Sequence, residues 1–486
     1  MKLRVIYDDR KAVSNEIAAF VSVGEYGSIV FRQKALRSRV QALCHARSWE
    51  FSHVSDQLTL AEARRGVAHE RGCRVLWLPA SLAPLDDDST ANQMERMLLV
   101  DGACVGTGLG TGLGTGVAPG SGLSAFGGGS AELFDQAARG EPIAAPDCFV
   151  DVAPAFVDVA DLTNLVDYLS GALGARHFNT VKRSAGNIVK FSRNKAKIKA
   201  EHDYFHLLPP AMKRWLVMPF DYSETELGAS YTMERLMLLD MGQQWINGGM
   251  RAEEFRRFLQ DIFRFIDERP RRKLEKGRAR ANFDTLYRTK VSERLKELQG
   301  LEIAGFIDDM VKSATGWPGL AAVFERYHAL VDRVADDIPD YECIAHGDAC
   351  FSNILYDRRT RMLKLIDPKG AVMQDELYAD PMYDVAKLSH SILGGYDFIT
   401  NGLYEITLGA DLRLHLHTPE AMYADYARLF IDELCARGLD PRAVRLFEAS
   451  LFLSMLPLHR DRPRNVLAFV LVAIDILREV ESHTHE

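Results

Sequence analysis

Short apolar runs alternate with amphipathic stretches over the first 150 residues of the chain. Apolar runs bounded by polar residues are typical of strands, and apolar residues that recur every three or four positions are typical of helices. On this pattern we predict strands at residues 3–7, 28–31, 72–78 and 97–100 and helices at 34–47 and 90–97. Such alternation predicts a three-layer α/β domain with a mostly parallel sheet.

The pattern changes after this region. One helix-like stretch, which Pro209 ends, lies among strand-like runs, the helix at 195–208 and the strands at 187–192, 215–219 and 229–236. The rest of the chain is mainly helical in pattern, at 245–338, 421–436, 441–456 and 465–481. We therefore predict the α+β class for this part, with a small sheet and one helix followed by a helical region.

Glycine fills 11 of the 24 positions from 106 to 129, beginning with a Gly-Thr-Gly-Leu repeat. This composition is typical of a flexible loop. The run 120–125 also matches a dinucleotide phosphate-binding fingerprint, but no predicted strand precedes it. Because domain boundaries fall in such segments, we predict an α/β domain at 1–150, Rossmann-like or nucleotidyltransferase-like, followed by parts at 151–245 and 246–486.

Composition and charge limit the classes of function. Hydrophobic residues make up 47% of the chain and charged residues 26%, which is typical of soluble globular proteins. The net charge of −8 excludes the basic footprint of a nucleic-acid-binding protein. No apolar run reaches the roughly 18 residues of a membrane span, and Asp8 and Asp9 end the first apolar run too early for a signal peptide. The seven cysteines are scattered, so we expect reduced thiols, no zinc site and a cytoplasmic location.

The residue types with the clearest chemistry lie between 344 and 370. His346-Gly347-Asp348 follows an apolar run, Asn353 comes five residues after Asp348, and Asp367 follows the strand-like run 362–366. Phosphoryl transfer to a hydroxyl uses one carboxylate to orient the nucleophile, and an Asn and a second carboxylate to hold Mg²⁺ on the nucleotide phosphates. We therefore predict Asp348 as the catalytic base and Asn353 and Asp367 as metal ligands.

These motifs resemble a known family. His-Gly-Asp-x-x-x-x-Asn, the later Ile-Asp, and Asp384-Val385-Ala386-Lys387-Leu388 are similar to the motifs of the aminoglycoside phosphotransferase and choline kinase group. The resemblance covers roughly residues 175–475 and implies a two-lobed protein-kinase-like fold, with 151–245 as the N-lobe and 246–486 as the helical C-lobe. It implies ATP or GTP as phosphoryl donor, Mg²⁺ as cofactor, and supporting roles for His346 and Asp384.

The resemblance also implies a Lys on an N-lobe strand, paired with a Glu on the next helix. Lys190 and Glu201 occupy such positions, so we predict that they form the pair and bind the nucleotide, with Lys182 as the competing lysine. The hinge between the lobes falls at Met233-Glu234-Arg235-Leu236, where the backbone groups of Glu234 and Leu236 would bind the purine. The hairpin 182–187 has one Gly and is a candidate phosphate cover.

Four polar segments each have two interpretations. The acidic run 85–88 is a turn before a helix or a divalent-metal site. The basic residues at 269–280 are a solvated loop or a contact for an anionic acceptor or membrane surface. The basic face at 286–294 reaches a phosphate-bearing or acidic substrate, or solvent. Residues 457–461 form an edge of the acceptor site or an ordinary helix end.

The expected function is phosphorylation of a hydroxyl on a small molecule or carbohydrate. The order of elements in the first domain is loosely similar to that of sugar-nucleotide-handling domains, so the expected setting is capsule or surface-polysaccharide synthesis. Choline, ethanolamine and aminoglycosides are alternative acceptors. Another alternative is a sugar-phosphate nucleotidyltransferase in the first domain, with a regulatory kinase-like module behind it. The sequence predicts neither the acceptor nor the oligomeric state.

Overall fold

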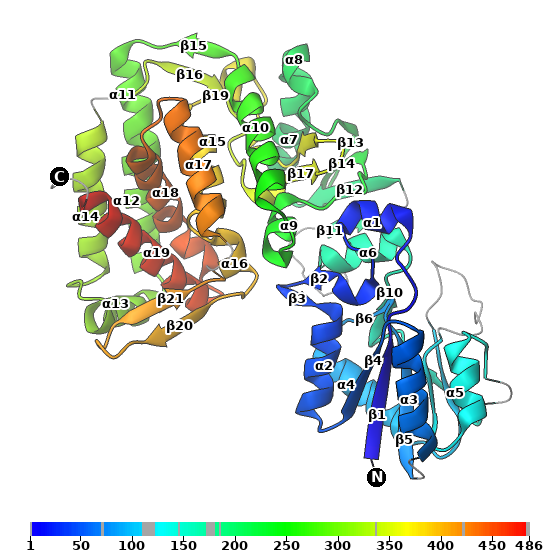
Figure 1. The fold of residues 1–486 in the computed structure, drawn as a ribbon. Helices are drawn as coiled ribbons and strands as arrows, with labels where there is room; N and C mark the ends of the chain where they lie inside the picture. Colours follow the sequence, from blue (N-terminus) through cyan, green and yellow to red (C-terminus); the bar gives the residue numbers. More distant parts are fainter. Residues whose placement is uncertain are drawn as a thin grey trace. The chain divides into compact units, whose positions relative to one another are not determined.

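The computed structural model describes residues 2–482 except 70–71, 109–121, 144–145, 172–179, 184–185, 336–337 and 420–422. By their contacts the residues form two units. The first is Met1–Arg176 with Asn247–Gly249, and the second is His177–Ile246 with Met250–Glu486. Each unit has a sheet and helices of its own (Figure 1).

The first unit is built on a six-stranded sheet with the order β4-β1-β5-β8-β7-β9. All strands except β8 run in one direction, since β1 pairs in parallel with β4 and β5, β7 pairs in parallel with β9, and β8 is antiparallel to β5 and β7. The strands are β1 (Lys2–Asp8), β4 (Glu50–Val54), β5 (Cys73–Pro79), β7 (Cys104–Thr107), β8 (Ser124–Gly127) and β9 (Cys148–Asp151).

Helices cover both faces of this sheet (Figure 1). Along β1 and β5, alternate side chains point to opposite faces, and Ile6, Val75 and Trp77 pack with buried residues of α3 (Gln57–His69) and α5 (Ala131–Ala138). The other face carries α2 (Leu36–Ala46) and α4 (Asp87–Leu99). The predicted three-layer arrangement with a mostly parallel sheet is therefore present.

Of the strands predicted in this unit, the one at 97–100 is wrong and the one at 28–31 is present only in part. Residues 97–100 end helix α4, because Met94, Met97 and Leu98 are buried together at helical spacing. Residues 28–31 hold only β2 (Val30–Phe31), which forms a separate hairpin with β3 (Lys34–Ala35) after the 3-10 turn Tyr26–Ser28. The prediction also lacked β4 and α3, whose sequences have weak alternation.

The first unit extends beyond residue 150. Strand β10 (Phe156–Asp158) pairs with β6 (Leu82–Pro84), and α6 (Leu162–Leu169) follows it. Grouping by contacts thus assigns residues 151–176 to the first unit, whereas the sequence pattern placed a boundary near 150. The remaining helix of the unit is α1 (Asn15–Val21).

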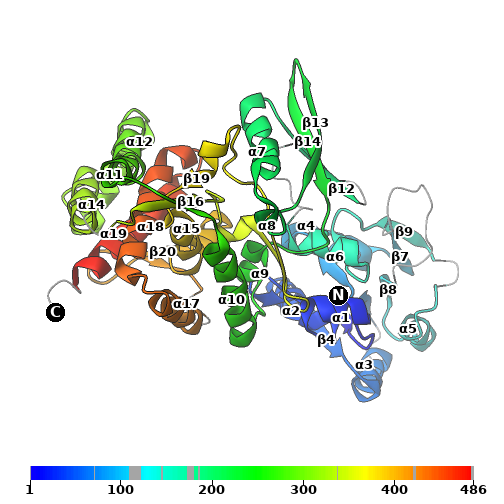
Figure 2. The ribbon, with the colours of Figure 1, turned by 90° about the horizontal axis from the view of Figure 1, so that it is seen from above.

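The second unit begins with a four-stranded antiparallel sheet in the order β11-β12-β14-β13. Its strands are β11 (Thr180–Arg183), β12 (Asn187–Ser192), β13 (Pro219–Thr225) and β14 (Gly228–Glu234). Helix α7 (Lys195–Leu207) lies along the sheet (Figure 2), where Ile198 packs against Ala229, Tyr231 and Met233. A small sheet with one helix is the predicted arrangement.

The predicted strand at 215–219 is mostly wrong. Helix α8 (Pro210–Lys213) comes first, and Trp215 and Leu216 are buried in the helical core, so that the strand starts only at Pro219. Val217 N donates to Leu365 O (3.2 Å), which ties this segment to the strand at residues 362–365.

The remainder of the second unit is helical, as predicted, around one large apolar core. The inner helices α18 and α19 are buried along most of their length. The helices are α9 (Met241–Asn247), α10 (Ala252–Glu268), α11 (Lys276–Asp284), α12 (Lys290–Gln299), α13 (Ile303–Ala314), α14 (Leu320–Val334), α15 (Tyr383–Ile392), α16 (Tyr396–Thr400), α17 (Ala424–Ala436), α18 (Pro441–Met455) and α19 (Pro463–Ser482). None of the helices in the described ranges is long and apolar enough to cross a membrane.

The segments between these helices contain short strands. β15 (Arg271–Lys273), β16 (Tyr341–Ile344) and β19 (Tyr378–Ala379) form one small sheet, and β17 (Ile354–Asp357) and β18 (Met362–Leu365) form a hairpin. A second hairpin, which the sequence did not predict, consists of β20 (Glu405–Leu408) and β21 (Leu414–His417).

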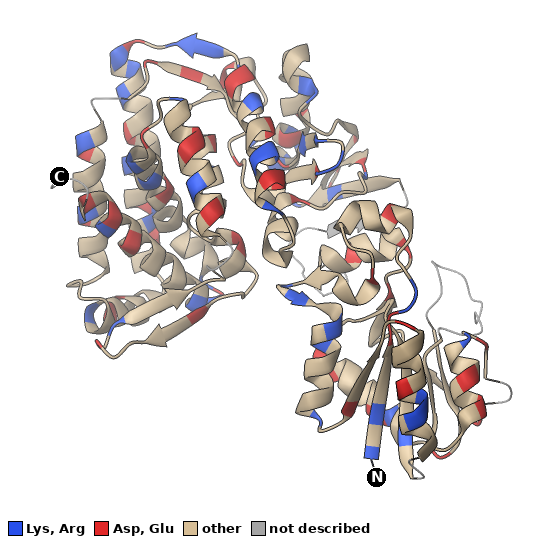
Figure 3. Cartoon of the chain, viewed as in Figure 1, with Lys and Arg blue, Asp and Glu red and all other residues tan. Residues whose placement is uncertain are grey.

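The basic segment at 269–280 is partly structural. Arg269 is buried and donates to Asp384 Oδ2 (2.9 Å), and Arg272 Nε donates to Glu342 Oε1 (2.7 Å) across the strand pair β15–β16. Figure 3 shows the positive charge on β15. These two arginines therefore stabilise the fold and are not free to bind an anion.

Candidate active site

The loop after β16 is held by a buried carboxylate from helix α15. Asp384 accepts hydrogen bonds from His346 N (2.9 Å) and Gly347 N (2.8 Å), and Arg269 binds the same carboxylate. Asp384 and His346 are both fully buried. Among the residues that the structure describes, neither ring nitrogen of His346 has a hydrogen-bond partner. Both residues thus shape the loop from behind, which fits the supporting roles predicted for them.

Gly347 is required in this loop. Its φ is +77°, a conformation that favours glycine. A Cβ atom at Gly347 would also lie 2.6 Å from Cβ of Lys369, because Lys369 N donates to His346 O (2.9 Å) and brings the two loops together. The His-Gly-Asp loop and the Asp-Pro-Lys-Gly loop are therefore packed backbone to backbone.

Asp348 presents its carboxylate beside this junction. The side chain is 41% exposed, so a ligand can reach it. Lys387 Nζ lies 2.9 Å from Oδ1, and Asn353 Nδ2 donates to Oδ2 (3.1 Å). Burial alone raises the pKa of the Asp348 carboxyl, but the charge and hydrogen bond of Lys387, together with His346 and the hydrogen bond from Asn353, lower it below its usual value. Asp348 is therefore a carboxylate at neutral pH, able to accept a hydrogen bond from a hydroxyl.

The two predicted metal ligands are adjacent in the fold. Asn353 ends the 3-10 turn Phe351–Asn353, and its Nδ2 also donates to Asp348 O (2.9 Å), which turns Oδ1 of the amide away from Asp348. Ile366 N donates to Asn353 O (3.0 Å), so Asp367 follows directly beside Asn353. Asp367 has a φ of +56°, an uncommon conformation for a non-glycine residue that often marks functional sites.

The donor set fits Mg²⁺. One amide oxygen and one carboxylate supply two protein ligands, and Mg²⁺ typically takes one or two protein ligands together with phosphate oxygens and water. The Asp367 side chain is 35% exposed, and only Oδ1 is engaged by Lys190. Elsewhere in the described ranges, no group of three or more His, Cys, Asp or Glu side chains could hold a metal ion.

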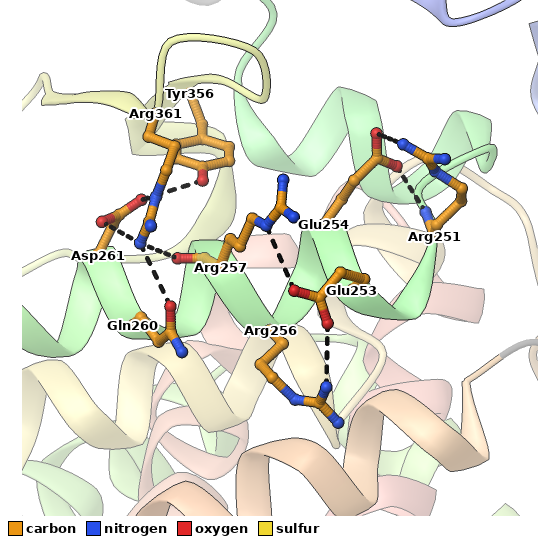
Figure 4. Close-up of polar contacts among 9 residues, drawn as sticks. All are labelled: Arg251, Glu253, Glu254, Arg256, Arg257, Gln260, Asp261, Tyr356 and Arg361. Atoms are coloured by element: carbon orange, nitrogen blue, oxygen red, sulfur yellow. Dashed lines mark hydrogen bonds and ion pairs between the residues drawn. The ribbon is translucent and has the colours of Figure 1, made fainter.

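An ion pair and a hydrogen bond to Asp261, together called the Asp261 clamp, hold the hairpin that separates Asn353 from Asp367 (Figure 4). Arg361, in the turn of β17–β18, donates through Nε and Nη2 to the two oxygens of Asp261 on α10 (2.9 and 2.8 Å). Tyr356 OH donates to the same carboxylate (3.1 Å). Because bidentate Arg–carboxylate pairs are directional, the clamp anchors the hairpin, and with it both metal-ligand candidates, to α10.

Lys190 on β12 and Glu201 on α7 form the predicted ion pair. Lys190 Nζ lies 2.7 Å from Glu201 Oε2 and 2.9 Å from Asp367 Oδ1. The side chains of Lys190 and Glu201 are only 4% and 2% exposed. Burial lowers the pKa of Lys190, but Asp367 and Glu201 together raise it above its usual value. Lys190 therefore carries a fixed positive charge that connects the small sheet to the metal-ligand loop.

Helix α7 and the metal-ligand loop are in close backbone contact as well. Ala371 N donates to Ala200 O (3.0 Å), next to Glu201. Gly370 has a φ of +93°, and a Cβ there would lie 2.8 Å from the Ala200 carbonyl carbon. Gly370 of the Ile-Asp-Pro-Lys-Gly sequence is thus explained by packing against α7.

The structure also places the other residues that were predicted to contact the nucleotide. Glu234 ends β14 opposite Asn187, and Leu236 lies two residues further on, in the segment that leads to α9. Lys182 lies on β11 opposite Val189, beside the strand that carries Lys190. Residues 184 and 185 of the hairpin, and the side chain of Lys182, lie outside the described part, so the phosphate-cover prediction stays a prediction.

Two carboxyls near the catalytic loop, the half-buried Asp240 and the buried Asp397, were not predicted. A Cβ at Gly242 would lie 2.8 Å from Asp397 Oδ1, 3.1 Å from Asp240 Oδ1 and 3.3 Å from Ser352 N, so the three groups surround Gly242. Burial raises the pKa of Asp240 to about 7 and that of Asp397 to about 6. No local sequence signal brings these residues together, since only the fold places α16 beside the start of α9.

Lys387 was also missed as a site residue. It lies on α15, three positions after Asp384, and residues at this spacing share one face of a helix. The signal was therefore present in the Asp384-Val385-Ala386-Lys387-Leu388 motif, but only the structure shows that Lys387 contacts Asp348.

The alternative sites gain little support. Asp86 accepts from Ser89 N (2.8 Å) as the N-cap of α4, which explains the acidic run 85–88 as a helix start. Most of the glycine-rich segment, including residues 120 and 121 of the fingerprint, lies outside the described ranges. His459 packs against Phe469 at the end of a helix, as in the ordinary interpretation of residues 457–461.

Comparison with known proteins gives a structural likeness only. No family model and no curated protein matches the chain. The structure of aminoglycoside phosphotransferase APH(3'')-Id from Streptomyces rimosus with ADP and streptomycin is similar to 61% of this chain and 98% of that chain, with 17% identity and a TM-score of 0.35. The structure of a thermostable mutant of APH(4)-Ia with ADP and hygromycin B is similar to 65% of this chain and 98% of that chain, with 14% identity and a TM-score of 0.36.

Aminoglycoside-3'-phosphotransferase of type VIII is similar to 55% of this chain and 84% of that chain, with 17% identity and a TM-score of 0.31. The similar structures are aminoglycoside phosphotransferases, which belong to the group that the motifs resemble, and the nature of the first unit stays a prediction. At these identities and TM-scores we draw no residue roles from the likeness and infer them from the contacts of this chain.

Proposed function

We propose that the chain is an ATP- or GTP-dependent phosphotransferase that acts on a hydroxyl of a small molecule or carbohydrate. One observation carries this proposal. Lys190 binds both Glu201 on α7 and Asp367 on the loop after β18, and Asp367 in turn lies beside Asn353, which is bonded to Asp348. Residues predicted separately from sequence thus form one connected polar site.

The contacts suggest a division of roles. Lys190 would donate to phosphate oxygens of the nucleotide, because Glu201 holds its ammonium in place. Asn353 and Asp367 would hold Mg²⁺, which when bound offsets the negative charge of the phosphates. Asp348 would orient the acceptor hydroxyl and accept its proton, since its carboxylate is accessible and ionised. The backbone groups of Glu234 and Leu236 remain the proposed purine contacts.

The identity of the acceptor stays a proposal at the level of class. The expected setting is capsule or surface-polysaccharide synthesis, in which the acceptor would be a carbohydrate hydroxyl. The alternative acceptors, choline, ethanolamine and aminoglycosides, also carry a hydroxyl. The rival in which the first unit is a sugar-phosphate nucleotidyltransferase predicts a different product, pyrophosphate. Phosphoryl transfer and nucleotidyl transfer can both be measured with the same protein.

The experiment is to measure ADP or GDP formation by the full chain with a panel of sugars, amino alcohols and aminoglycosides, with and without Mg²⁺. Pyrophosphate release from CTP or UTP with sugar phosphates is measured in parallel. Asp367→Asn should abolish Mg²⁺-dependent turnover, whereas Asp375→Asn, an exposed carboxylate in the following turn, should not. Pyrophosphate release that survives Asp367→Asn, without nucleoside diphosphate formation, would contradict the proposal.

A further inference from the structure

Lys387 occupies an unusual position beside Asp348. Its ammonium lies 2.9 Å from Oδ1, although its side chain is only 16% exposed and comes from α15 rather than from the catalytic loop. Asn353 takes the other oxygen of Asp348. The first two turns of α15 therefore fix both the loop backbone, through Asp384, and the orientation of the Asp348 carboxylate, through Lys387.

The ammonium of Lys387 has unused donor capacity. A lysine has three N–H donors, and in the described part of the chain Asp348 is the one carboxylate bonded to Lys387. The Tyr383 ring, 6.0 Å away, provides only a weak second contact. A largely buried cation with free donors is costly unless a second anionic group binds it. This arrangement favours a negatively charged ligand next to Asp348.

The proposed reaction brings such a group to this place. In the transfer, the bond between the γ-phosphorus and the bridging oxygen breaks, and that oxygen keeps the electron pair and leaves with the nucleoside diphosphate. The acceptor oxygen bonds to phosphorus, and its proton passes to Asp348. The phosphorus must therefore lie at bonding distance from the hydroxyl oxygen that Asp348 orients. The three outer oxygens of the phosphoryl group share its negative charge.

We propose that Lys387 donates simultaneously to Asp348 and to an outer oxygen of the phosphoryl group in transfer, and so stabilises that group between nucleotide and acceptor. This inference rests on the proposed function. It assigns Lys387 to the reacting group itself, whereas Lys190 contacts the nucleotide from the other lobe. Lys387 remains protonated throughout the step.

The test uses the full chain and does not need the acceptor. Affinity for MgADP is measured by calorimetry with and without aluminium fluoride, which binds beside ADP as a mimic of the phosphoryl group in transfer. Wild type should bind MgADP more tightly with aluminium fluoride present. Lys387→Met should keep its affinity for MgADP within about twofold and lose most of the gain, since removing one such donor typically costs about 100-fold.

Matched variants separate this role from a structural one. Lys290→Met removes a lysine whose Nζ lies 3.3 Å from Tyr383 OH, with no contact to Asp348, and it should keep the full gain from aluminium fluoride. Lys387→Arg keeps the charge and should retain part of the gain. Lys387→Gln can still donate to Asp348 but should lose the gain from aluminium fluoride, as Lys387→Met does. It replaces Lys387→Met in the experiment if that variant fails to fold.

Each other outcome has a defined meaning. A full gain from aluminium fluoride in folded Lys387→Met and Lys387→Gln overturns the inference. Equal loss of affinity for MgADP alone also overturns it, because Lys387 would then serve the nucleotide site in general. Binding of MgADP by wild type without any gain overturns it and leaves the nucleotide site intact. No binding of MgADP or MgGDP by wild type refutes the proposed function itself.

Discussion

Replacing Lys190 with Met should separate the contribution of the buried ion pair to stability from its contribution to function. Lys190 and Glu201 are almost completely buried, and Lys190 lies 2.7 Å from Glu201 Oε2. Met has a similar length and no charge, so the change leaves the volume filled and removes the ammonium. Asp367, which is 35% exposed, can then be solvated, but Glu201 cannot.

The magnitude follows from the charge left behind. Removing one partner of a buried pair typically destabilises a protein by about 3–5 kcal/mol, because the other charge stays buried and uncompensated. Glu201 retains a hydrogen bond from Tyr231 OH (3.2 Å) and an ion pair with Lys197 Nζ (3.7 Å), so we expect the lower end, about 3 kcal/mol. In the double variant Lys190→Met/Glu201→Gln, the side-chain amide at position 201 is neutral and can still accept from Tyr231 OH. About 2 kcal/mol of the lost free energy of unfolding should therefore be regained. Nucleotide turnover should stay lost in both variants.

The assay is urea unfolding followed by tryptophan fluorescence. Three of the five tryptophans, Trp215, Trp245 and Trp317, belong to the second unit, so its transition dominates the signal. Lys182→Met is the comparison on the neighbouring strand and should lose less stability and less turnover than Lys190→Met. A free energy of unfolding for Lys190→Met within 1 kcal/mol of wild type would refute this reasoning, as would restored turnover in the double variant.

Three further results are expected. Asp367→Asn should abolish Mg²⁺-dependent turnover while its circular dichroism and melting temperature stay near wild type, and nearly full turnover at saturating Mg²⁺ would remove it as a metal ligand. Asp348→Ala should reduce acceptor phosphorylation by at least about 100-fold but leave ATP affinity within a few-fold, which parallel turnover and calorimetry can check. Asp240→Asn should alter the pH dependence of stability. Burial raises the pKa of Asp240 from 3.8 to about 7, so the native state binds a proton in this window that the unfolded state has lost, and wild-type stability falls as pH rises from about 4 to 7. The fall should be smaller in the variant, where Asp397, whose pKa burial raises to about 6, still contributes to it, and the variant should be more stable than wild type by about 1–2 kcal/mol at pH 8. Parallel urea curves at pH 5 and pH 8 that match those of wild type would contradict this prediction.

Local sequence patterns predicted which residues of the candidate site lie close together. Asp348, Asn353 and Asp367 lie within 20 residues of one another, and short loops and one hairpin leave few ways to arrange them. Lys190 and Glu201 are separated by a single turn between a strand and a helix. At such short separations, the type of each element largely determines which side chains meet.

Contacts between distant segments could not be predicted in this way. Lys387 reaches Asp348 from another helix, and Asp240 and Asp397 meet near Gly242 only because α9 and α16 pack beside the same loop. Such proximity depends on the packing of the whole helical region, which no local pattern describes.

Errors in the predicted elements have local causes. The apolar run at 97–100 has the pattern of a short strand, although Met94 and Met97 already follow a helical period. Trp215 and Leu216 are apolar because they fill the helical core, not because they belong to a strand. Short apolar runs are ambiguous between strand and helix, and tertiary packing decided both cases.

The most direct test of the central claim is a crystal structure of the full chain with a non-hydrolysable ATP analogue and Mn²⁺, located by its anomalous signal. The account predicts the metal between Asn353 Oδ1 and Asp367, bound also by phosphate oxygens, with Lys190 on the phosphates and the terminal phosphate directed toward Asp348 and Lys387. A triphosphate and metal bound to the six-stranded sheet of the first unit, with the Lys190–Asp367 site empty, would contradict it.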